Sequence, residues 1–312
     1  MNHIIRIILA LTALGAVLGT ALKMAGCQKA DPSATSMSIE EVVRTTSAPI
    51  GSLTDELADG LVPVELLCPE SIDPSRWRPD ADTIGRFQRA KLIVTNGAQH
   101  ERWVATAPLP RSRVVDSALA ITPPLLTYTQ KTHSHGPDGK HTHKAVLGST
   151  WVDPLNARSQ AQAVQDALAR SFPEHAPEIS ERFSMLSQEL ESAHRMLEQI
   201  RDRDINFVAP IKPYGYLARR YGWAAPDLSN SPDDWLKDPY TLNLIADPSG
   251  EVPTVVLTDS PPSPEAVETL VNKYSIHPVL WETGSMIHDR PYLEILAGNI
   301  ERLERAVDEA LK

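Results

Sequence analysis

Residues 173–203, PEHAPEISERFSMLSQELESAHRMLEQIRDR, carry the pattern that decides the fold. Apolar side chains recur in this segment at spacings of three and four residues, which places them along one face of a helix. Charged residues occupy the other faces, so we interpret the segment as an amphipathic soluble helix, roughly 40 Å long at 1.5 Å per residue. The alternative is one core helix of a single domain. The apolar stripe consists of Ile179, Phe183, Leu186, Leu190, Ala193, Leu197 and Ile200.

Short β-rich runs alternate with helical patterns on both sides of this helix. Strand, helix and strand in repeated order predict parallel α/β units. We therefore expect an α/β fold of two lobes, each with a central, mostly parallel sheet and flanking helices, joined by one long backbone helix. The N-terminal lobe would cover 38–172, the linking helix 173–203 and the C-terminal lobe 204–312. The β-rich runs fall at 42–46, 62–67, 91–97, 113–116, 205–209, 252–258 and 277–282.

Two stretches between these runs carry more specific expectations. Residues 224–253 are rich in Asp, Pro and Ser, which predicts a loop with little regular structure. A helix start is expected directly after the run at 91–97.

The N-terminus has the pattern of an export signal. Arg6 precedes a short apolar run over 7–22, and small residues at 25–26 stand directly before Cys27. This pattern predicts a secretory signal peptide over 1–26, and small residues before a cysteine resemble a bacterial lipobox. Cys27 would then carry lipid, and the polar segment 27–37 would be a tether. The alternative is an ordinary signal anchor with an incidental cysteine.

Charge and cysteine content limit the classes of function. The chain has 312 residues and a formal net charge of −10, which makes nucleic acid and anionic membrane surfaces poor partners. With Cys27 lipidated, Cys68 is left alone, so neither a disulfide within the chain nor a zinc–thiolate cluster can form. Cys68 lies in an apolar run, and we expect it to be a small buried side chain.

The strongest chemical signal is a histidine cluster, THSHGPDGKHTHK, at 132–144. In an extended segment residues i and i+2 project to the same side, so each His-x-His pair can converge on one cation. The Gly-Pro-Asp-Gly between the pairs predicts a turn that could fold one pair back on the other. Four neutral imidazoles suit Zn²⁺, Cu²⁺ or Ni²⁺ better than Mg²⁺ or Ca²⁺. The candidate metal ligands in the His-rich loop 130–145 are His133, His135, His141 and His143; the alternative is a solvated loop with no specific role.

Three further residues are candidate metal ligands. His100 and Glu101 follow the third β-rich run, where loops at the carboxyl ends of parallel strands form ligand crevices. Glu101 could equally be a residue of a first helical turn, favoured there by the helix dipole. Glu282 ends the run at 277–282 in the second lobe. His175, Asp289 and the long helix's His194 are expected to be solvated, and His277 and His288 could be plain surface.

Enzymatic function has no support in the sequence. No His-Glu-x-x-His helix, Gly-x-Ser-x-Gly elbow or Gly-x-x-x-x-Gly-Lys loop is present, so we expect no catalytic residues. The six scattered tryptophans are expected to be packing residues, although such rings could also line a sugar site.

The order of elements resembles the periplasmic zinc- and manganese-binding proteins of ABC transporters. The resemblance implies two α/β lobes joined by a single backbone helix, with the metal between the lobes. Five strings in the family's order carry it over nearly all of the mature chain. They are VVRTTSAPIGSLTDELADGLVPVELLCPESIDP (42–74), AKLIVTNGAQHERW (90–103), STWVDPLNARSQAQAV (149–164), PYGYLARRYGW (213–223) and YLEILAGNIERLERAVDEAL (292–311).

The chain departs from the pattern of this family at the metal site. The resemblance implies a histidine in the corner that here reads Asp73-Pro74-Ser75, another at Ser149, and a third at Ile211 or Lys212. Serine, isoleucine and a charged lysine cannot replace imidazole as strong zinc ligands. The interlobe site is therefore expected to be altered or lost, whereas the fold and the transport role survive.

We therefore expect an exported, membrane-anchored lipoprotein, periplasmic or at the cell surface. It would be the substrate-binding component of an ABC importer that captures a transition-metal ion and delivers it to a membrane permease. Zn²⁺ is the expected cargo, with Mn²⁺, Ni²⁺ and Cu²⁺ as alternatives. The other interpretation is a divergent member without the interlobe metal site, acting as a loop-based metal buffer or binding another small solute. A third and more remote interpretation is an exported enzyme or a surface adhesin with the same fold.

Overall fold

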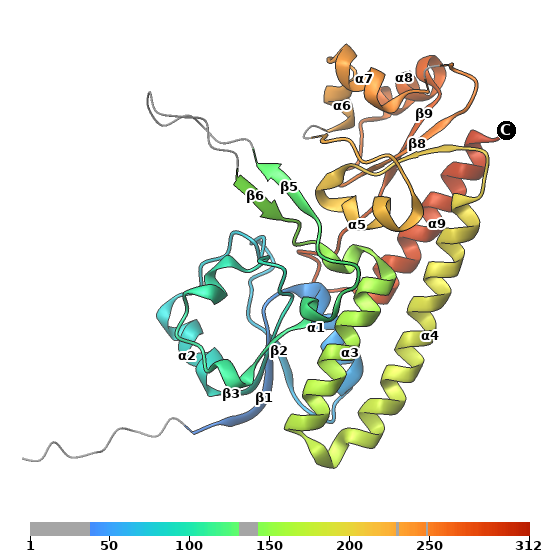
Figure 1. Ribbon diagram of the computed structural model, residues 1–312. Coiled ribbons are helices and arrows are strands. Elements are labelled where there is room, and N and C mark those ends of the chain that lie inside the picture. The colour runs from blue at the N-terminus through green and yellow to red at the C-terminus, as the bar shows by residue number, and fades with distance from the viewer. Residues whose placement is uncertain (1–37, 131–142, 229–230, 248) are drawn as a thin grey trace, which may run out of the picture. The chain divides into compact units, whose positions relative to one another are not determined.

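The computed structural model describes residues 38–130, 143–228, 231–247 and 249–312 (Figure 1). The expected leader and tether over 1–37, including Cys27, lie outside the described residues. So do three of the histidine candidates, His133, His135 and His141. Of the fourth, His143, only the backbone is described.

A four-stranded parallel sheet forms the first half of the fold. Its strand order is β2-β1-β3-β4, with β1 at Glu40–Thr45, β2 at Val64–Leu66, β3 at Ala90–Thr95 and β4 at Val114–Asp116. Two helices connect its first three strands, α1 at Ala48–Ala58 and α2 at Ala81–Arg89. Short 3₁₀ turns follow at Arg102–Ala105, Arg111–Arg113 and Ser117–Ala120. The turn at Arg102–Ala105 replaces the helix start that the sequence predicts after the third strand.

A three-stranded parallel sheet forms the second half. Its order is β7-β8-β9, with β7 at Asn206–Val208, β8 at Thr254–Thr258 and β9 at Ile276–Leu280. The helices α5 (Ile211–Tyr221) and α8 (Pro264–Tyr274) connect the strands, and α9 (Tyr292–Ala310) closes the chain. Two short helices, α6 at Pro232–Trp235 and α7 at Pro239–Ile245, lie inside the segment that the sequence predicts to be irregular. Those helices hold Trp235, Leu242 and Ile245 in a core cluster with β8, so packing orders a segment of polar composition.

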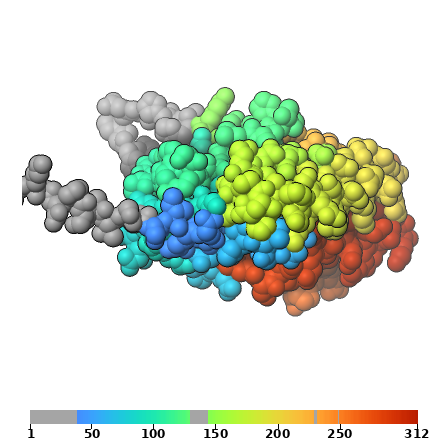
Figure 2. Space-filling model, turned by 90° about the horizontal axis from the view of Figure 1, so that it is seen from below, coloured from blue at the N-terminus to red at the C-terminus, as the bar shows by residue number. Residues whose placement is uncertain are grey.

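The long helix α4 spans Ala176–Arg201, preceded by a 3₁₀ turn at Pro173–His175. It packs against α3 (Pro154–Ser171) and against α9, and Figure 1 shows it beside both. In Figure 2 the yellow-green surface of α3 and α4 runs beside the red surface of α9. Six stripe residues are buried, and Phe183 is partly buried against the same core.

One continuous apolar core joins the two sheets through α4. It contains Val43 of β1, Leu190 of α4 and Val279 of β9. The α/β fold with two parallel sheets and a long helix is therefore confirmed.

A β-hairpin stands apart from both sheets. Strand β5 (Thr127–Gln130) pairs antiparallel with β6 (His143–Val146), and Gln130 lies opposite His143 in the register. A 3₁₀ turn at Thr150–Val152 then leads into α3. Figure 1 shows these two strands, and the His-rich segment lies between them in the sequence.

Other expectations about single residues have mixed outcomes. All six tryptophans are buried, and Cys68 is a buried free thiol, as predicted. The prediction for His194 is wrong, because its Nδ1 lies 3.0 Å from the Tyr221 hydroxyl and its ring packs near that phenol. Within the described ranges, no helix is both long and apolar enough to cross a membrane.

Candidate functional site

A cavity of about 620 Å³ lies at the carboxyl ends of both sheets. The segments that follow β2, β3, β7, β8 and β9 all contribute to its wall, together with the β5–β6 hairpin. This is the edge at which open parallel sheets bind ligands. The polar and charged lining residues are Asp73, Ser75, Arg76, Gln99, His100, Arg102, Tyr128, Ser149, Lys212, Asp259, Thr283 and Ser285. We call this cavity the interlobe cleft.

The loop after β3 brings His100 to the cleft. Gly97, Ala98 and Gln99 have φ values of 79°, 52° and 58°, so three successive residues adopt the left-handed conformation. A Cβ at position 97 would fall 1.5 Å from Oδ1 of Asp116, which requires glycine there. The left-handed conformation is unfavourable for Ala98 and Gln99, so the surrounding contacts must hold it.

Glu101 holds the start of this loop. Its carboxylate accepts hydrogen bonds from the backbone N–H of Asn96 at 2.9 Å, from that of Gly97 at 3.3 Å and from Thr46 Oγ1 at 2.5 Å. The side chain is only 4% exposed. Glu101 therefore points into the fold beneath the loop and does not line the cleft.

The ring of His100 lies between the 148–151 segment and the cleft. It packs edge-on against Trp151, and its Nε2 is buried without a hydrogen-bond partner in the described part of the chain. A Cβ at Gly148 would lie 2.7 Å from His100 Nδ1 and 3.1 Å from its Cα. Glycine at 148 is what allows the imidazole to approach this backbone so closely.

A buried polar network holds the 148–151 segment in place. The side-chain amide of Asn96 donates to the Gly148 carbonyl at 2.9 Å, and its oxygen accepts from Thr150 at 3.1 Å and Gln160 at 3.0 Å. The side chains of Asn96, Thr150 and Gln160 are completely buried. Because each partner is satisfied, the network fixes both the His100 loop and the facing segment.

The opposite wall comes from the start of α5. Ser149 Oγ donates to the Pro213 carbonyl at 2.5 Å, which joins the first half of the chain to the second. The Lys212 ammonium lies 3.1 Å from Asp227 and 5.0 Å from the centre of the Tyr128 ring. A lysine therefore lines the cleft directly beside the hairpin.

The hairpin itself is anchored to the second half. The Tyr216 hydroxyl donates to the Leu147 carbonyl at 2.8 Å and accepts from the Leu126 N–H at 3.2 Å. Tyr128 and Val146, one from each strand, line the cleft. In the sequence, residues 131–142 connect these two strands.

The predicted ligands are only partly brought together. Of those whose side chains are described, His100 lines the cleft, whereas Glu101 and Glu282 do not. Glu282 is paired with Arg290 at 2.5 Å and Arg302 at 2.9 Å. The two guanidinium groups lower the pKa of Glu282, chiefly through the Arg290 hydrogen bond. Across 38–130, 143–228, 231–247 and 249–312, no three His, Cys, Asp or Glu side chains form a group that could hold a metal ion.

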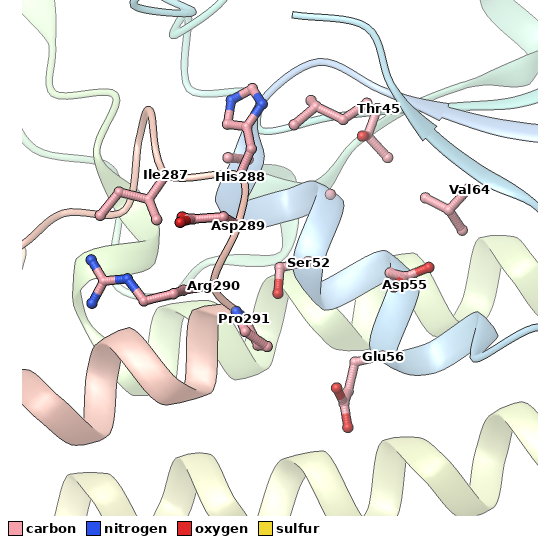
Figure 3. A pocket seen from close by; sticks show the side chains of 13 residues that line it. Thr45, Ser52, Asp55, Glu56, Val64, Ile287, His288, Asp289, Arg290 and Pro291 are labelled. Atoms are coloured by element: carbon pink, nitrogen blue, oxygen red, sulfur yellow. The ribbon is translucent and has the colours of Figure 1, made fainter. Parts of the chain in front are cut away.

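A second cavity, of about 390 Å³, lies between α1 and residues 287–291. Figure 3 shows Asp55 and Glu56 projecting from α1, with His288 and Asp289 on the facing loop. Asp289 is exposed, as predicted for a surface charge. This cavity and the interlobe cleft share no lining residue.

Sequence reasoning missed several residues that shape the cleft. Asn96 and Gly148 gave no signal, because a lone amide and a lone glycine are compatible with many loops. The sequence predicts Trp151 to be a packing residue that could also line a sugar site, and gives no sign that its ring forms the surface on which His100 lies. Ser75, Ser149 and Lys212, singled out for the absence of imidazole, all line one cavity.

Two parallel sheets, a core shared through one long helix and a cavity at the carboxyl ends of the strands define an α/β protein with one candidate ligand cleft. The model of the family described as zinc-uptake complex component A, periplasmic (ZnuA), matches residues 43–306. The chain belongs to this family.

Individual relatives are distant in sequence and close in fold. The chain is 24% identical over 200 residues to the high-affinity zinc uptake system protein ZnuA of Bacillus subtilis, covering 61% of this chain and 62% of that protein. It thus spans less than two thirds of that relative's length. It also resembles the structure of the metal-dependent lipoprotein YcdH of Bacillus subtilis, with a TM-score of 0.67 and 19% identity. This similarity covers 85% of this chain and 98% of YcdH. The chain also resembles FpvC of Pseudomonas aeruginosa in complex with Mn²⁺, with a TM-score of 0.62 and 20% identity. This similarity covers 86% of this chain and 98% of FpvC.

Proposed function

We propose that this chain is the extracytoplasmic binding component of an ABC importer, which captures a transition-metal ion and passes it to a membrane permease. Zn²⁺ is the expected cargo, because the family is one of zinc uptake and a relative is a zinc uptake protein. Mn²⁺, Ni²⁺ and Cu²⁺ remain alternatives; FpvC, a protein of this fold, is known in complex with Mn²⁺ and with Ni²⁺. A binding component of this kind performs no chemical turnover.

One observation carries the proposal: His100 and the hairpin that bears the His-rich segment line the same cleft. A metal ion held by His133, His135, His141 or His143 would therefore be tethered beside the one imidazole of the described cleft. A neutral imidazole is a strong ligand for Zn²⁺, Ni²⁺ and Cu²⁺. The buried, unpartnered Nε2 of His100 fits this role, because a bound ligand would satisfy it.

The experiment compares Zn²⁺ affinity in the unaltered protein and three variants by calorimetry against a competing chelator. Replacing His133, His135, His141 and His143 together by alanine should remove most binding, and adding His100→Ala should remove the remainder. His175→Ala, away from the cleft, is the matched control and should bind as the unaltered protein does. Full affinity in the fivefold variant would refute the ligand assignment.

Protonation gives a second test of imidazole ligation. Histidine must be neutral to bind metal, so affinity should fall as the pH drops through about 6.5, the ordinary pKa of histidine. An affinity that stays constant from pH 7.5 to pH 5.5 would point to other ligands.

We further propose that Cys27 carries the lipid that anchors the protein to a membrane. The support is the short apolar run and the small residues before this cysteine. Cys27→Ser should leave an unprocessed or soluble protein, seen by mass spectrometry and membrane fractionation. An unchanged mass and an unchanged membrane fraction would exclude lipidation at this residue.

A further inference from the structure

The interlobe cleft is larger than a bare metal ion requires. Its volume of about 620 Å³ falls within the range of about 300–1,000 Å³ that is typical of pockets for small organic molecules. Its wall has the matching composition, with the rings of Tyr128 and Trp151 beside hydroxyl groups from Ser75 and Ser149. A site for a naked cation would instead draw several ligand atoms to within about 2 Å of one point.

The charges of the side chains that line the cleft also make it unfavourable for a bare cation. Three basic side chains, Arg76, Arg102 and Lys212, line the cleft against two acidic ones, Asp73 and Asp259. This balance is positive, although the whole chain has a formal charge of −10.

The acidic partners leave much of this positive charge available. Arg76 reaches Asp73 only at 3.9 Å, and its side chain is 87% exposed. Lys212 pairs with Asp227 at 3.1 Å, with both side chains more than 40% exposed. Such exposed ion pairs are weak and can be exchanged for a ligand's carboxylate. Arg102 makes no ion pair with any described residue.

We propose that the interlobe cleft binds the metal as a small anionic chelate, in which an organic polycarboxylate already holds the ion. Arg76, Arg102 and Lys212 pair with the carboxylates, and Tyr128 contacts the carbon skeleton. The chelator supplies the ligand atoms that the described wall lacks. This inference is built on the proposed function, because it names the form in which the metal is captured.

The test uses the full chain with His133, His135, His141 and His143 replaced by alanine, so that the His-rich segment no longer binds metal. Calorimetry then measures Zn²⁺ alone, citrate alone, Zn²⁺ in excess citrate, and the Zn²⁺–nitrilotriacetate complex. We expect at least one complex to bind about tenfold or more tightly than either Zn²⁺ or the free chelator. Equal or tighter binding of bare Zn²⁺, or of the free chelator, overturns the proposal.

Charge variants localise the binding to the cleft. Arg76→Gln with Lys212→Gln should weaken binding of the complex about tenfold, because two favourable charge interactions are lost. Arg78→Gln is the matched control, since Arg78 lies in the same segment, is exposed and does not line the cleft. Thermal melts verify that each variant is folded. An unchanged affinity in the folded double variant overturns the assignment to the cleft.

The two proposals fail in different ways. Metal capture by the histidines fails if the fivefold histidine variant keeps the Zn²⁺ affinity of the unaltered protein. The chelate proposal fails if complexes show no advantage over bare Zn²⁺ in the quadruple variant, whatever the unaltered protein does.

Discussion

The imidazole of His100 lies edge-on against the indole of Trp151, with ring centres 5.0 Å apart and planes inclined by 73°. Trp151 is itself held from the second half of the fold. Its Nε1 donates to the Thr283 carbonyl at 2.7 Å, and its carbonyl accepts from the Tyr292 hydroxyl at 2.6 Å. The position of the candidate ligand therefore depends on contacts that cross between the two sheets.

Gly148→Ala should weaken metal binding without unfolding the protein. The added Cβ would lie 2.7 Å from His100 Nδ1 and 3.1 Å from its Cα, so the loop must move. Displacing a positioned ligand in this way is expected to lower Zn²⁺ affinity about tenfold. Calorimetry measures the effect, and Gly298→Ala on α9, with its nearest neighbour at 3.6 Å, is the control. Equal affinities in the two variants would show that the position of His100 does not matter for binding.

Glu101→Gln should lower stability and leave the stoichiometry of metal binding unchanged. The buried carboxylate accepts from two backbone N–H groups and Thr46, and an amide can satisfy them only in part. We expect a loss of about 2 kcal/mol in the free energy of unfolding, measured by urea denaturation. Glu174→Gln, at an exposed position, is the control. A stable variant with reduced metal stoichiometry would instead identify Glu101 as a ligand.

Glu282→Gln should lower stability at neutral pH and have a smaller effect in acid. Hydrogen bonds and charge from Arg290, with further help from Arg302, lower the pKa of Glu282 below its ordinary value of 4.5. A lowered folded pKa contributes stability that is present above the unfolded value and is lost as the pH falls through the folded value. We expect a difference of about 1 kcal/mol at pH 7 that shrinks steadily below pH 4.5.

Urea denaturation at several pH values measures this difference, with Glu304→Gln on the exposed face of α9 as the control. A difference that stays constant down to pH 3 would mean that the ion pairs with Arg290 and Arg302 do not stabilise the fold.

Cys68 should be unreactive in the folded protein. Burial, together with the charges of Asp73 and Glu101, raises the pKa of its thiol to about 12, so almost no thiolate exists at neutral pH. In the Cys27→Ser background, Cys68 is the only cysteine. Iodoacetamide should label it at least a hundredfold more slowly in buffer than in urea, as followed by mass spectrometry. Rapid labelling of the folded protein would show that the thiol is accessible.

Local sequence pattern was enough to predict the long helix and the strands of the two parallel sheets. The three-and-four spacing of Ile179, Leu186 and Leu190 predicts α4, because a helix places those residues on one face whatever it packs against. The alternation of β-rich and helical runs predicts parallel sheets for the same local reason. The helices at 232–235 and 239–245 escaped prediction, since their order comes from packing against β8 and not from their composition.

What the sequence by itself determined is the long helix, the alternation of strands and helices on either side of it, the α/β class and the presence of imidazole-rich chemistry at 132–144. Only the tertiary structure decided which side chains share a site. Glu101 and His100 are neighbours in the chain, yet one is buried under the loop and the other lines the cleft. Ser75, Ser149 and Lys212 come from three distant segments and meet in one cavity. The direction of a side chain depends on the φ angles of its loop and on the partners that other segments bring to it, and neither is encoded in local spacing.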